Sequence, residues 1–391
     1  MIKGYIYTVL AGFMIFVAGT FQAVIAEEVQ IHGFISQGYL KTDHNNYLAK
    51  TDDGSFQFNE MGINFTTFAT ERLQIGCQFF ARDLGDVGND EIVVNWAFAE
   101  YNYRNWLGFR AGILKTNFGL YNDTRDYDSL RTPIFLPTSN YHELLRDTLN
   151  TVKGIQIFGT IPLGLAGSLN YLALTAGNQA DLKSGSVKFL KSATGLSEIS
   201  NMTAGERIYG ADFQWLTPLD GLRWGMTYGR FSYGYDALLP TPMGDIPVSY
   251  EAHKAEYIVF YGEYIWKNLV LSAETYRAKM DSDVYLQNSD TLLQSVDVDT
   301  RKSYYIKLSY RITDWFETGY YFSRFQLNPN STDDKEKLKE HCLSFRFDIN
   351  PNWLFKLEAH LMKGEFGVYP DNDGHIYNEW MLYAAKISFM F

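Results

Sequence analysis

Apolar and polar residues alternate one by one along several segments of the chain. The clearest examples are residues 72–82, 208–216, 342–349 and 352–363. In a β-strand, successive side chains point to opposite faces, so each of these segments has one apolar and one polar face. The alternation therefore predicts strands that lie between an apolar and an aqueous environment.

The same pattern can be followed along the whole chain and predicts sixteen strands, with fourteen or eighteen as alternative counts. The expected strands are residues 28–42, 55–70, 72–84, 91–104, 106–115, 152–161, 164–176, 206–218, 221–235, 253–267, 269–282, 300–314, 315–328, 339–350, 352–366 and 376–391. Alternation is weakest in 91–104 and 315–328. An even number of strands is what a closed antiparallel barrel in a bacterial outer membrane requires.

The connections between these strands are alternately short and long. The short ones are at 70–71, 104–105, 162–163, 219–221, 266–268, 313–314 and 350–352. The longer ones are 43–54, 85–90, 116–151, 177–205, 236–252, 283–299, 329–338 and 367–375. Transmembrane barrels pair short periplasmic turns with longer extracellular loops, whereas nothing in a soluble β-sandwich would make short and long connections alternate along the chain. We therefore predict an all-β transmembrane antiparallel barrel with both termini in the periplasm.

The two ends of the chain favour export to the outer membrane. Residues 1–26 have a positive start, an apolar stretch over 6–18 and a small-residue ending, as in a cleaved signal peptide. The alternative, a membrane anchor, needs a longer apolar run. Residues 27–391 are then a single barrel domain without another apolar run near the roughly 20 residues of a spanning helix. The last predicted strand ends on Phe391, which resembles the signal read by the outer-membrane insertion machinery.

Composition agrees with this plan and argues against one class of partner. The chain has 28 Tyr, 28 Phe and 8 Trp at a mean hydropathy of only −0.21, which suits alternating strands with aromatic girdles. Its two cysteines, Cys77 and Cys342, provide no disulfide framework and are expected to be reduced. Nucleic acid is not expected as a partner, because the formal net charge is −11 and affinity for nucleic acid rests on clustered positive charge.

The third loop, residues 116–151, is the longest connection and has a character of its own. It contains apolar residues, including Leu130, Ile134, Phe135 and Leu144, which indicate packing rather than disorder. The passage from the preceding strand into this loop, residues 111–121, reads Ala-Gly-Ile-Leu-Lys-Thr-Asn-Phe-Gly-Leu-Tyr. It resembles the strand-to-loop passage of relatives of the phosphate-selective porins O and P. The plan of the whole mature chain resembles the sixteen-stranded porins of Gram-negative bacteria. This resemblance implies a third loop folded into the lumen and a homotrimeric assembly.

The charges expected around the channel have both signs. The candidates for a pore constriction in the third loop are Arg125, Asp126, Asp128, Arg131, Glu143, Arg146 and Asp147, with Asp123 nearby. By alternation, the candidates for the pore wall are Arg72, Arg82, Arg110, Asp212, Arg223, Lys307, Arg311, Arg346, Lys356 and Glu358, with Glu60 and Asp348. A phosphate-selective channel would need a largely basic constriction, which the acidic residues of this loop do not provide. The excess of basic wall candidates predicts a mild anion preference; the alternative is a set of paired charges without preference.

Signals of catalysis and of cofactor binding are weak. Histidines such as His32, His253 and His341 are scattered and lack the local signatures of outer-membrane phospholipases or proteases, so no enzyme activity is predicted. The acidic stretch 83–91 lacks the regular spacing of a calcium loop, and no metal or other cofactor is expected. Five tryptophans near predicted strand ends are assigned to interfacial belts, with a carbohydrate-stacking slide as the alternative. They are Trp106, Trp266, Trp315, Trp353 and Trp380.

The sequence thus predicts a porin through which small hydrophilic solutes or ions diffuse. Its expected partners are outer-membrane lipid, lipopolysaccharide, the insertion machinery and two further copies of the chain. One alternative is a solute-specific channel for phosphate, an organic acid or an oligosaccharide. Another is a plugged barrel whose long loops, chiefly 177–205 and 236–252, bind a partner at the cell surface.

Overall fold

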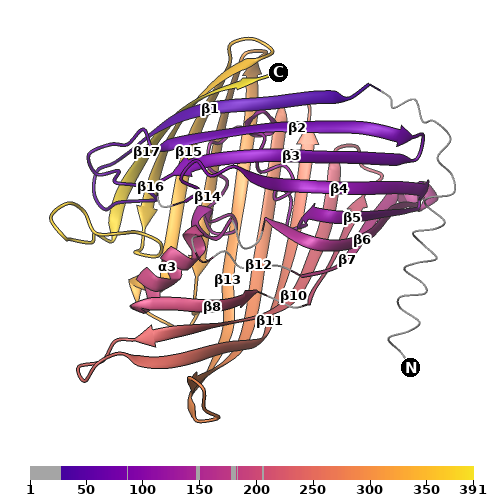
Figure 1. Ribbon diagram of the computed structural model, residues 1–391. Coiled ribbons are helices and arrows are strands. Elements are labelled where there is room, and N and C mark those ends of the chain that lie inside the picture. The colour runs from indigo at the N-terminus through magenta and orange to yellow at the C-terminus, as the bar shows by residue number, and fades with distance from the viewer. Residues whose placement is uncertain (1–27, 86, 147–149, 178–181, 183, 205–206) are drawn as a thin grey trace, which may run out of the picture.

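The computed structural model describes residues 28–391 except 86, 147–149, 178–181, 183 and 205–206. The predicted signal peptide therefore lies outside the described residues. The described residues form seventeen strand segments in one sheet, which is shown in Figure 1. They are β1 (Gln30–Thr42), β2 (Phe58–Thr70), β3 (Leu73–Leu84), β4 (Val93–Arg104), β5 (Leu107–Lys115), β6 (Thr151–Pro162), β7 (Ser168–Gly177), β8 (Glu198–Ala204), β9 (Ile208–Leu216), β10 (Leu222–Leu239), β11 (Ile246–Trp266), β12 (Leu269–Leu286), β13 (Leu292–Thr313), β14 (Phe316–Gln326), β15 (Lys337–Asp348), β16 (Trp353–Lys363) and β17 (Glu379–Met390).

The sheet closes on itself as an antiparallel barrel. Apart from β8, which pairs with β10, the strands pair with their neighbours along the chain; β7 pairs with β9, and β1 pairs with both β2 and β17. The backbone of Phe391 extends the closure, because its N–H and C=O both bond to Gly33 at 3.0 Å. β8 and β9 pair with successive parts of β10, so they are two segments of one wall strand. The barrel therefore has sixteen strands, and the predicted fold class is confirmed.

Two predicted loops are wrong in length because the strands continue through them. β10, β11, β12 and β13 contain 18, 21, 18 and 22 residues, so most of the expected loops 236–252 and 283–299 is strand. The expected loop 177–205 includes β8 and the helix α3 (Gly185–Thr194). Val187 of this helix packs with Ile199, Tyr235 and Val248 on the extended sheet. Burial of these side chains explains why the alternation continues beyond the expected strand ends.

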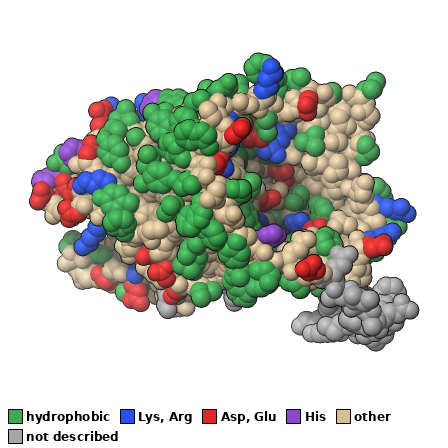
Figure 2. All heavy atoms as spheres, turned by 90° about the horizontal axis from the view of Figure 1, so that it is seen from above, with side chains coloured by type: hydrophobic (Ala, Val, Ile, Leu, Met, Phe, Trp, Pro, Cys, Tyr) green, Lys and Arg blue, Asp and Glu red, His purple; other side chains and the backbone are tan. Residues whose placement is uncertain are grey.

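The two faces of the barrel wall differ in polarity. Along β16, buried and more exposed residues alternate, with Lys356, Glu358 and His360 inside and Leu357 and Leu361 outside. Large apolar side chains are exposed around the outer surface, much of which is apolar in Figure 2. Burying such a surface in lipid is favourable, and the inward polar groups then face the lumen. Among the described residues, no helix is long and apolar enough to cross a bilayer.

Four of the five tryptophans assigned to interfacial belts are exposed beside short turns. Trp106, Trp266 and Trp315 are more than half exposed and Trp353 is 39% exposed. Trp380 was assigned wrongly, because it is only 2% exposed and packs against Tyr47 inside the barrel. Its indole N–H donates to the Gly364 carbonyl at 3.2 Å. The turn-side tryptophans therefore form an aromatic belt at one rim of the barrel, whereas Trp380 belongs to the interior.

Candidate functional site: the barrel lumen

The third loop, called L3 below (residues 116–150), crosses the lumen. Close to its start, the backbone N–H of Gly119 donates to Thr227 on β10 at 3.3 Å, and that of Leu120 donates to Glu274 on β12 at 2.7 Å. Close to its end, Arg146 donates to Glu60 on β2 at 2.7 Å. β2 and β10 lie about half the circumference apart in the strand order. L3 is therefore held at both sides of the barrel.

L3 is packed as tightly as a protein core. Ile134, Phe135 and Leu144 are at most 3% exposed and belong to one apolar cluster with residues of the first and eighth loops. Leu136 belongs to a second apolar cluster, against the wall formed by β11 and β13. Leu130 is the exception at 61% exposed, because it faces the cavity described below. The packing predicted for this loop is confirmed.

A network of buried charges fixes the end of L3 to the wall. The Arg146 guanidinium lies 2.7 Å from Glu60 and 2.6 Å from Asp126, and it is 3.4 Å from Glu143. Lys115, at the end of β5, is 2.5 Å from Asp126. Burial alone would raise the pKa of Asp126, but Lys115 and Arg146 outweigh it and hold this pKa below its usual range. Asp126 is therefore an anionic anchor of the loop.

Glu143 is a second anionic anchor in the same network. Its carboxylate lies 2.8 Å from Arg125 of L3 and 3.2 Å from Arg82 of β3. Burial would raise the pKa of Glu143, but Arg125, Arg146 and Arg82 together hold it below its usual range. The pair with Arg82 ties the loop directly to the wall.

A second group of charges holds the middle of L3 against β17. Lys386 lies 2.5 Å from Glu60 and 2.7 Å from Asp128, and Asp128 is 3.1 Å from Arg131. Burial would raise the pKa of Asp128, but the cations around it, above all Lys386, hold it well below its usual range. Asp128 therefore remains ionised at neutral pH.

β16 binds the backbone of L3 directly. The Lys356 ammonium donates to the carbonyls of Asp128, Arg131 and Pro133 at 2.7, 2.8 and 3.2 Å. The Glu358 carboxylate accepts the N–H groups of Ile134 at 2.7 Å and Phe135 at 3.1 Å. Lys356 and Glu358, called the β16 clamp below, thus satisfy five backbone groups of L3 with two wall side chains.

Below L3 the lumen contains a cavity of about 1260 Å³. Its lining reaches from L3 to the short-turn ends of the strands, such as Asn105 and Pro162. Acidic and basic side chains are visible inside the hollow in Figure 2. The charged residues in its lining are Arg110, Asp123, Arg131, Asp212, Arg223, Glu263, Lys307, Arg311, Glu317 and Arg346. Six of these ten are basic.

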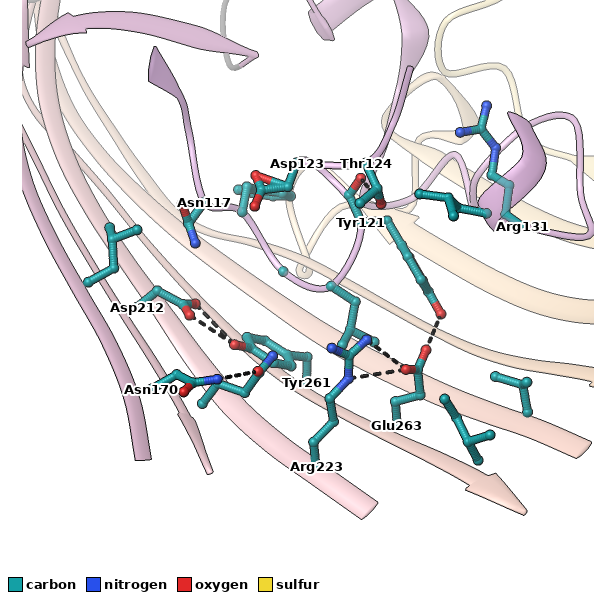
Figure 3. A pocket seen from close by; sticks show the side chains of 18 of the residues that line it. Asn117, Tyr121, Asp123, Thr124, Arg131, Asn170, Asp212, Arg223, Tyr261 and Glu263 are labelled. Carbon is teal, nitrogen blue, oxygen red and sulfur yellow. Dashed lines mark hydrogen bonds and ion pairs between the residues drawn. The ribbon is translucent and has the colours of Figure 1, made fainter. Parts of the chain in front are cut away.

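Most charges in the cavity are paired. Arg223 lies 2.6 Å from Glu263, which also accepts the Tyr121 hydroxyl at 2.9 Å, as Figure 3 shows. Arg311 lies 2.8 Å from Glu317. Lys307 differs, because within the described part of the chain it forms no ion pair and lies 4.0 Å from the centre of the Tyr121 ring. Lys307 is therefore a lining cation without a direct ion pair in the described chain, although the Glu263 and Glu274 carboxylates are close enough to interact with it.

The candidate site residues separate into two groups. Arg110, Arg131, Asp212, Arg223, Lys307, Arg311 and Arg346 line the cavity. Arg82, Arg125, Asp126, Asp128, Glu143, Arg146, Lys356 and Glu358 are at most 7% exposed and hold L3 in place. Arg72 lies in the turn between β2 and β3, so it is not part of the strand wall. Asp147 lies outside the described residues.

Sequence reasoning missed several inward acids, among them Glu263, Glu274 and Glu317. All three are in phase with other inward residues of their strands, for example Glu274 with Ser272, which is 1% exposed. Their position in the alternation of inward and outward residues was therefore the signal that could have identified them. It was obscured because large aromatic residues such as Tyr261 and Tyr305 also point inward.

His142 gives the packing of L3 a pH dependence. Its ring is 6% exposed and its Nδ1 accepts the Leu144 N–H at 3.3 Å, and burial lowers its pKa to about 4. In a displaced loop the pKa of His142 would return to about 6.5. Between about pH 4 and 6.5, the displaced loop would therefore bind a proton more readily than the packed loop. The contribution of His142 to the stability of the packed loop is therefore complete above about pH 6.5. It decreases by roughly 3 kcal/mol as the pH falls towards 4.

We expect limited proteolysis of L3 to accelerate between pH 6.5 and 4. His142→Leu should flatten this dependence, whereas His375→Gln should leave it unchanged because His375 is exposed on the eighth loop. An identical profile in the wild type and His142→Leu would contradict the assignment.

The closed antiparallel barrel, its apolar outer surface and the loop across its lumen define a transmembrane β-barrel of the porin type. The fold is that of the sixteen-stranded outer-membrane porins of Gram-negative bacteria. The anion-selective porin from Comamonas acidovorans matches with a TM-score of 0.58 and 12% identity, over 94% of this chain and 100% of that chain. The outer membrane channel DcaP of Acinetobacter baumannii matches at 0.57 and 12%, over 94% and 99%.

A third solved structure has the same fold in an assembled form. OmpT of Vibrio cholerae, in its trimer form, matches with a TM-score of 0.52 and 10% identity, over 93% of this chain and 99% of that chain. No family model and no curated protein matches this chain. At these identities the comparisons show the fold alone.

Proposed function

We propose that the protein is an outer-membrane porin through which small hydrophilic solutes and ions diffuse down their gradients. The observation that carries this proposal is the charge-lined cavity of about 1260 Å³ inside a closed barrel. Charged and hydrogen-bonding groups that line a lumen replace part of the hydration of a passing solute. Diffusion needs neither a cofactor nor a chemical step, and we propose no enzymatic activity.

Liposome swelling tests this proposal. Vesicles that contain the folded protein should swell in solutions of small sugars and amino acids, and more slowly as the solute becomes larger. Swelling with one solute class only would favour the solute-specific alternative. Intact barrels that give no swelling with any solute would overturn the diffusion channel and favour the plugged alternative, which the anchoring of L3 on both sides of the lumen also suggests.

We further propose a mild preference for anions. Six basic and four acidic side chains line the cavity, and Lys307 lacks an ion-pair partner within the described chain. A unit charge about 8 Å from an ion in water changes its energy by about 0.5 kcal/mol, which is roughly a two-fold change in local concentration. Arg110, Arg131 and Arg346 pair with carboxylates outside the lining, so Lys307 is the lining cation that supports a modest selectivity.

Lys307→Gln should reduce the ratio of chloride to potassium permeability, on the order of two-fold. The measurement is the reversal potential of the channel under a salt gradient. Lys302→Gln is the matched control, because this substitution removes the same charge from the same strand at an exposed position. A clear preference of the wild type for cations, or equal shifts in both variants, would contradict the proposed role of Lys307.

The outer surface supports a proposed homotrimer in lipid and lipopolysaccharide. A shallow, mostly apolar depression of about 410 Å³ lies over β2 to β5 and is lined partly by the small residues Gly76, Ala97, Ala99 and Ala111. Small side chains allow the close approach of a second barrel wall. Phe391 stays a proposed signal for the insertion machinery. Cross-linking of the protein in native membranes would test the trimer, and monomers alone would contradict it.

A further inference from the structure

Three side chains with metal-binding atoms meet on the inner face of the wall, beside the β16 clamp. Cys342 of β15 is directly opposite His360 of β16 in the strand register, and Glu358 is two residues before His360. The Cys342 sulfur is 3.9 Å from His360 Nε2, which is 3.1 Å from Glu358 Oε2. All three residues are buried, and their ligand atoms lie within 4.8 Å of one another.

These separations suit a tetrahedral zinc ion. Zinc binds sulfur at about 2.3 Å and nitrogen or carboxylate oxygen at about 2.0–2.2 Å. Tetrahedral angles then place sulfur about 3.5 Å from nitrogen, and nitrogen about 3.3 Å from oxygen. The observed distances of 3.9 and 3.1 Å need adjustments of only a few tenths of an ångström, and the sulfur and the Glu358 oxygen, which lie within 4.8 Å of each other, must approach to about 3.6 Å. A thiolate, an imidazole and a carboxylate are also a donor set that zinc accepts.

The surroundings already orient the imidazole as a ligand. Glu340 Oε1 lies 2.8 Å from His360 Nδ1, which directs the other ring nitrogen towards Cys342 and Glu358. Glu340 itself accepts hydrogen bonds from Tyr321 at 2.8 Å and Ser323 at 2.9 Å. A carboxylate that accepts the second N–H of a metal-binding histidine is a recurrent outer partner, because it fixes the ring and raises its basicity.

We propose that Cys342, His360 and Glu358 form a zinc site, with Glu340 as the positioning residue. Zinc would take the place of the hydrogen between His360 Nε2 and Glu358. Starting from an imidazolium and a thiol, binding releases one proton from Nε2 and one from the sulfur, and no atom is oxidised or reduced. A water or the second Glu358 oxygen completes four ligands.

Electrostatics permits this exchange in a buried site. Without metal, one imidazolium and two carboxylates give the cluster a formal charge of −1. With Zn²⁺, one thiolate, two carboxylates and a neutral imidazole, the charge is again −1. The buried site therefore gains no net charge, which is the condition for avoiding a large desolvation cost. Because Glu358 also binds the N–H groups of Ile134 and Phe135, the ion would stiffen the attachment of L3.

Cobalt provides the spectroscopic test. The folded, detergent-solubilised protein is stripped with a chelator and titrated first with Co²⁺ and then with Zn²⁺. We expect a thiolate-to-cobalt charge-transfer band that saturates at one ion per chain, is lost on addition of zinc, and accompanies the release of protons to the buffer. Absence of this band from the folded wild type would overturn the proposal, whatever the channel conducts.

Two cysteine variants locate the site. Cys342→Ser should lose the band, whereas Cys77→Ser should keep it because Cys77 lies on β3, away from the cluster. A band that survives in Cys342→Ser and disappears in Cys77→Ser would also overturn the proposal. If Cys342→Ser does not fold, His360→Gln keeps the sulfur and should weaken cobalt binding at least ten-fold; unchanged binding there would contradict the assignment.

Discussion

Arg146→Ala is expected to release L3 from the wall and to raise single-channel conductance severalfold. The guanidinium of Arg146 lies within 3.4 Å of the carboxylates of Glu60, Asp126 and Glu143, and is only 3% exposed. Its removal leaves these buried acids with one cation fewer. Loss of one partner from a buried ion pair typically costs about 3–5 kcal/mol. The loop can avoid this cost by moving into water, which widens the passage.

The matched control is Arg230→Ala. Arg230 is 52% exposed and lies 4.0 Å from Glu256, so this pair is expected to contribute little because water screens it. The conductance of Arg230→Ala should equal that of the wild type. Heat-modifiable migration in gels establishes that both variants form barrels. If Arg146→Ala forms a barrel with wild-type conductance and wild-type resistance of L3 to proteolysis, the anchoring role of this network is wrong.

Lys356→Met is expected to make the channel noisy, with frequent openings to a larger conductance. The Lys356 ammonium is the shared donor to three L3 carbonyls, those of Asp128, Arg131 and Pro133. Methionine keeps much of the apolar stem but donates no hydrogen bond. The Asp128 and Arg131 carbonyls then keep only longer bonds of 3.4 Å, from the Arg131 N–H and from Arg346. A buried carbonyl left without a partner costs about 1–3 kcal/mol, so displacement of residues 128–133 becomes accessible. Single-channel recordings at constant voltage measure the frequency of these openings.

Lys363→Met tests whether this effect is specific. Lys363 lies on the same strand, but its side chain is 54% exposed and pairs with Glu379 at the barrel rim. The Lys363→Met substitution removes the same charge without affecting a contact to L3, so recordings of this variant should be as quiet as those of the wild type. Equal noise in both lysine variants would show that charge on β16, rather than the β16 clamp, governs the stability of the open channel.

The fold could be predicted from the sequence because every spanning strand carries its own signal. One face meets lipid and the other meets the lumen, and this difference imposes alternation on each segment separately. The lengths of β10 to β13 could not be predicted, since alternation also continues where α3 and loop side chains cover the sheet. Trp380 was misplaced for a related reason, because a position near a strand end does not reveal which face is buried.

The site could be predicted only in part. Alternation indicated that Arg223, Lys307 and Arg311 face inward, and these residues line the cavity. It could not distinguish them from Lys356, which faces inward but is covered by L3. The charges of L3 have the same ambiguity. Arg146 binds Glu60, which is 86 residues away in the sequence, and only the folded loop brings the two together.

The measurement that tests the central claim most directly is the single-channel conductance of the purified protein in a planar bilayer with a salt gradient. We predict discrete ohmic steps, with a reversal potential that indicates a mild preference for anions. Folded and inserted barrels without conductance would contradict the account. In that case L3 closes the lumen and the long loops must carry the function.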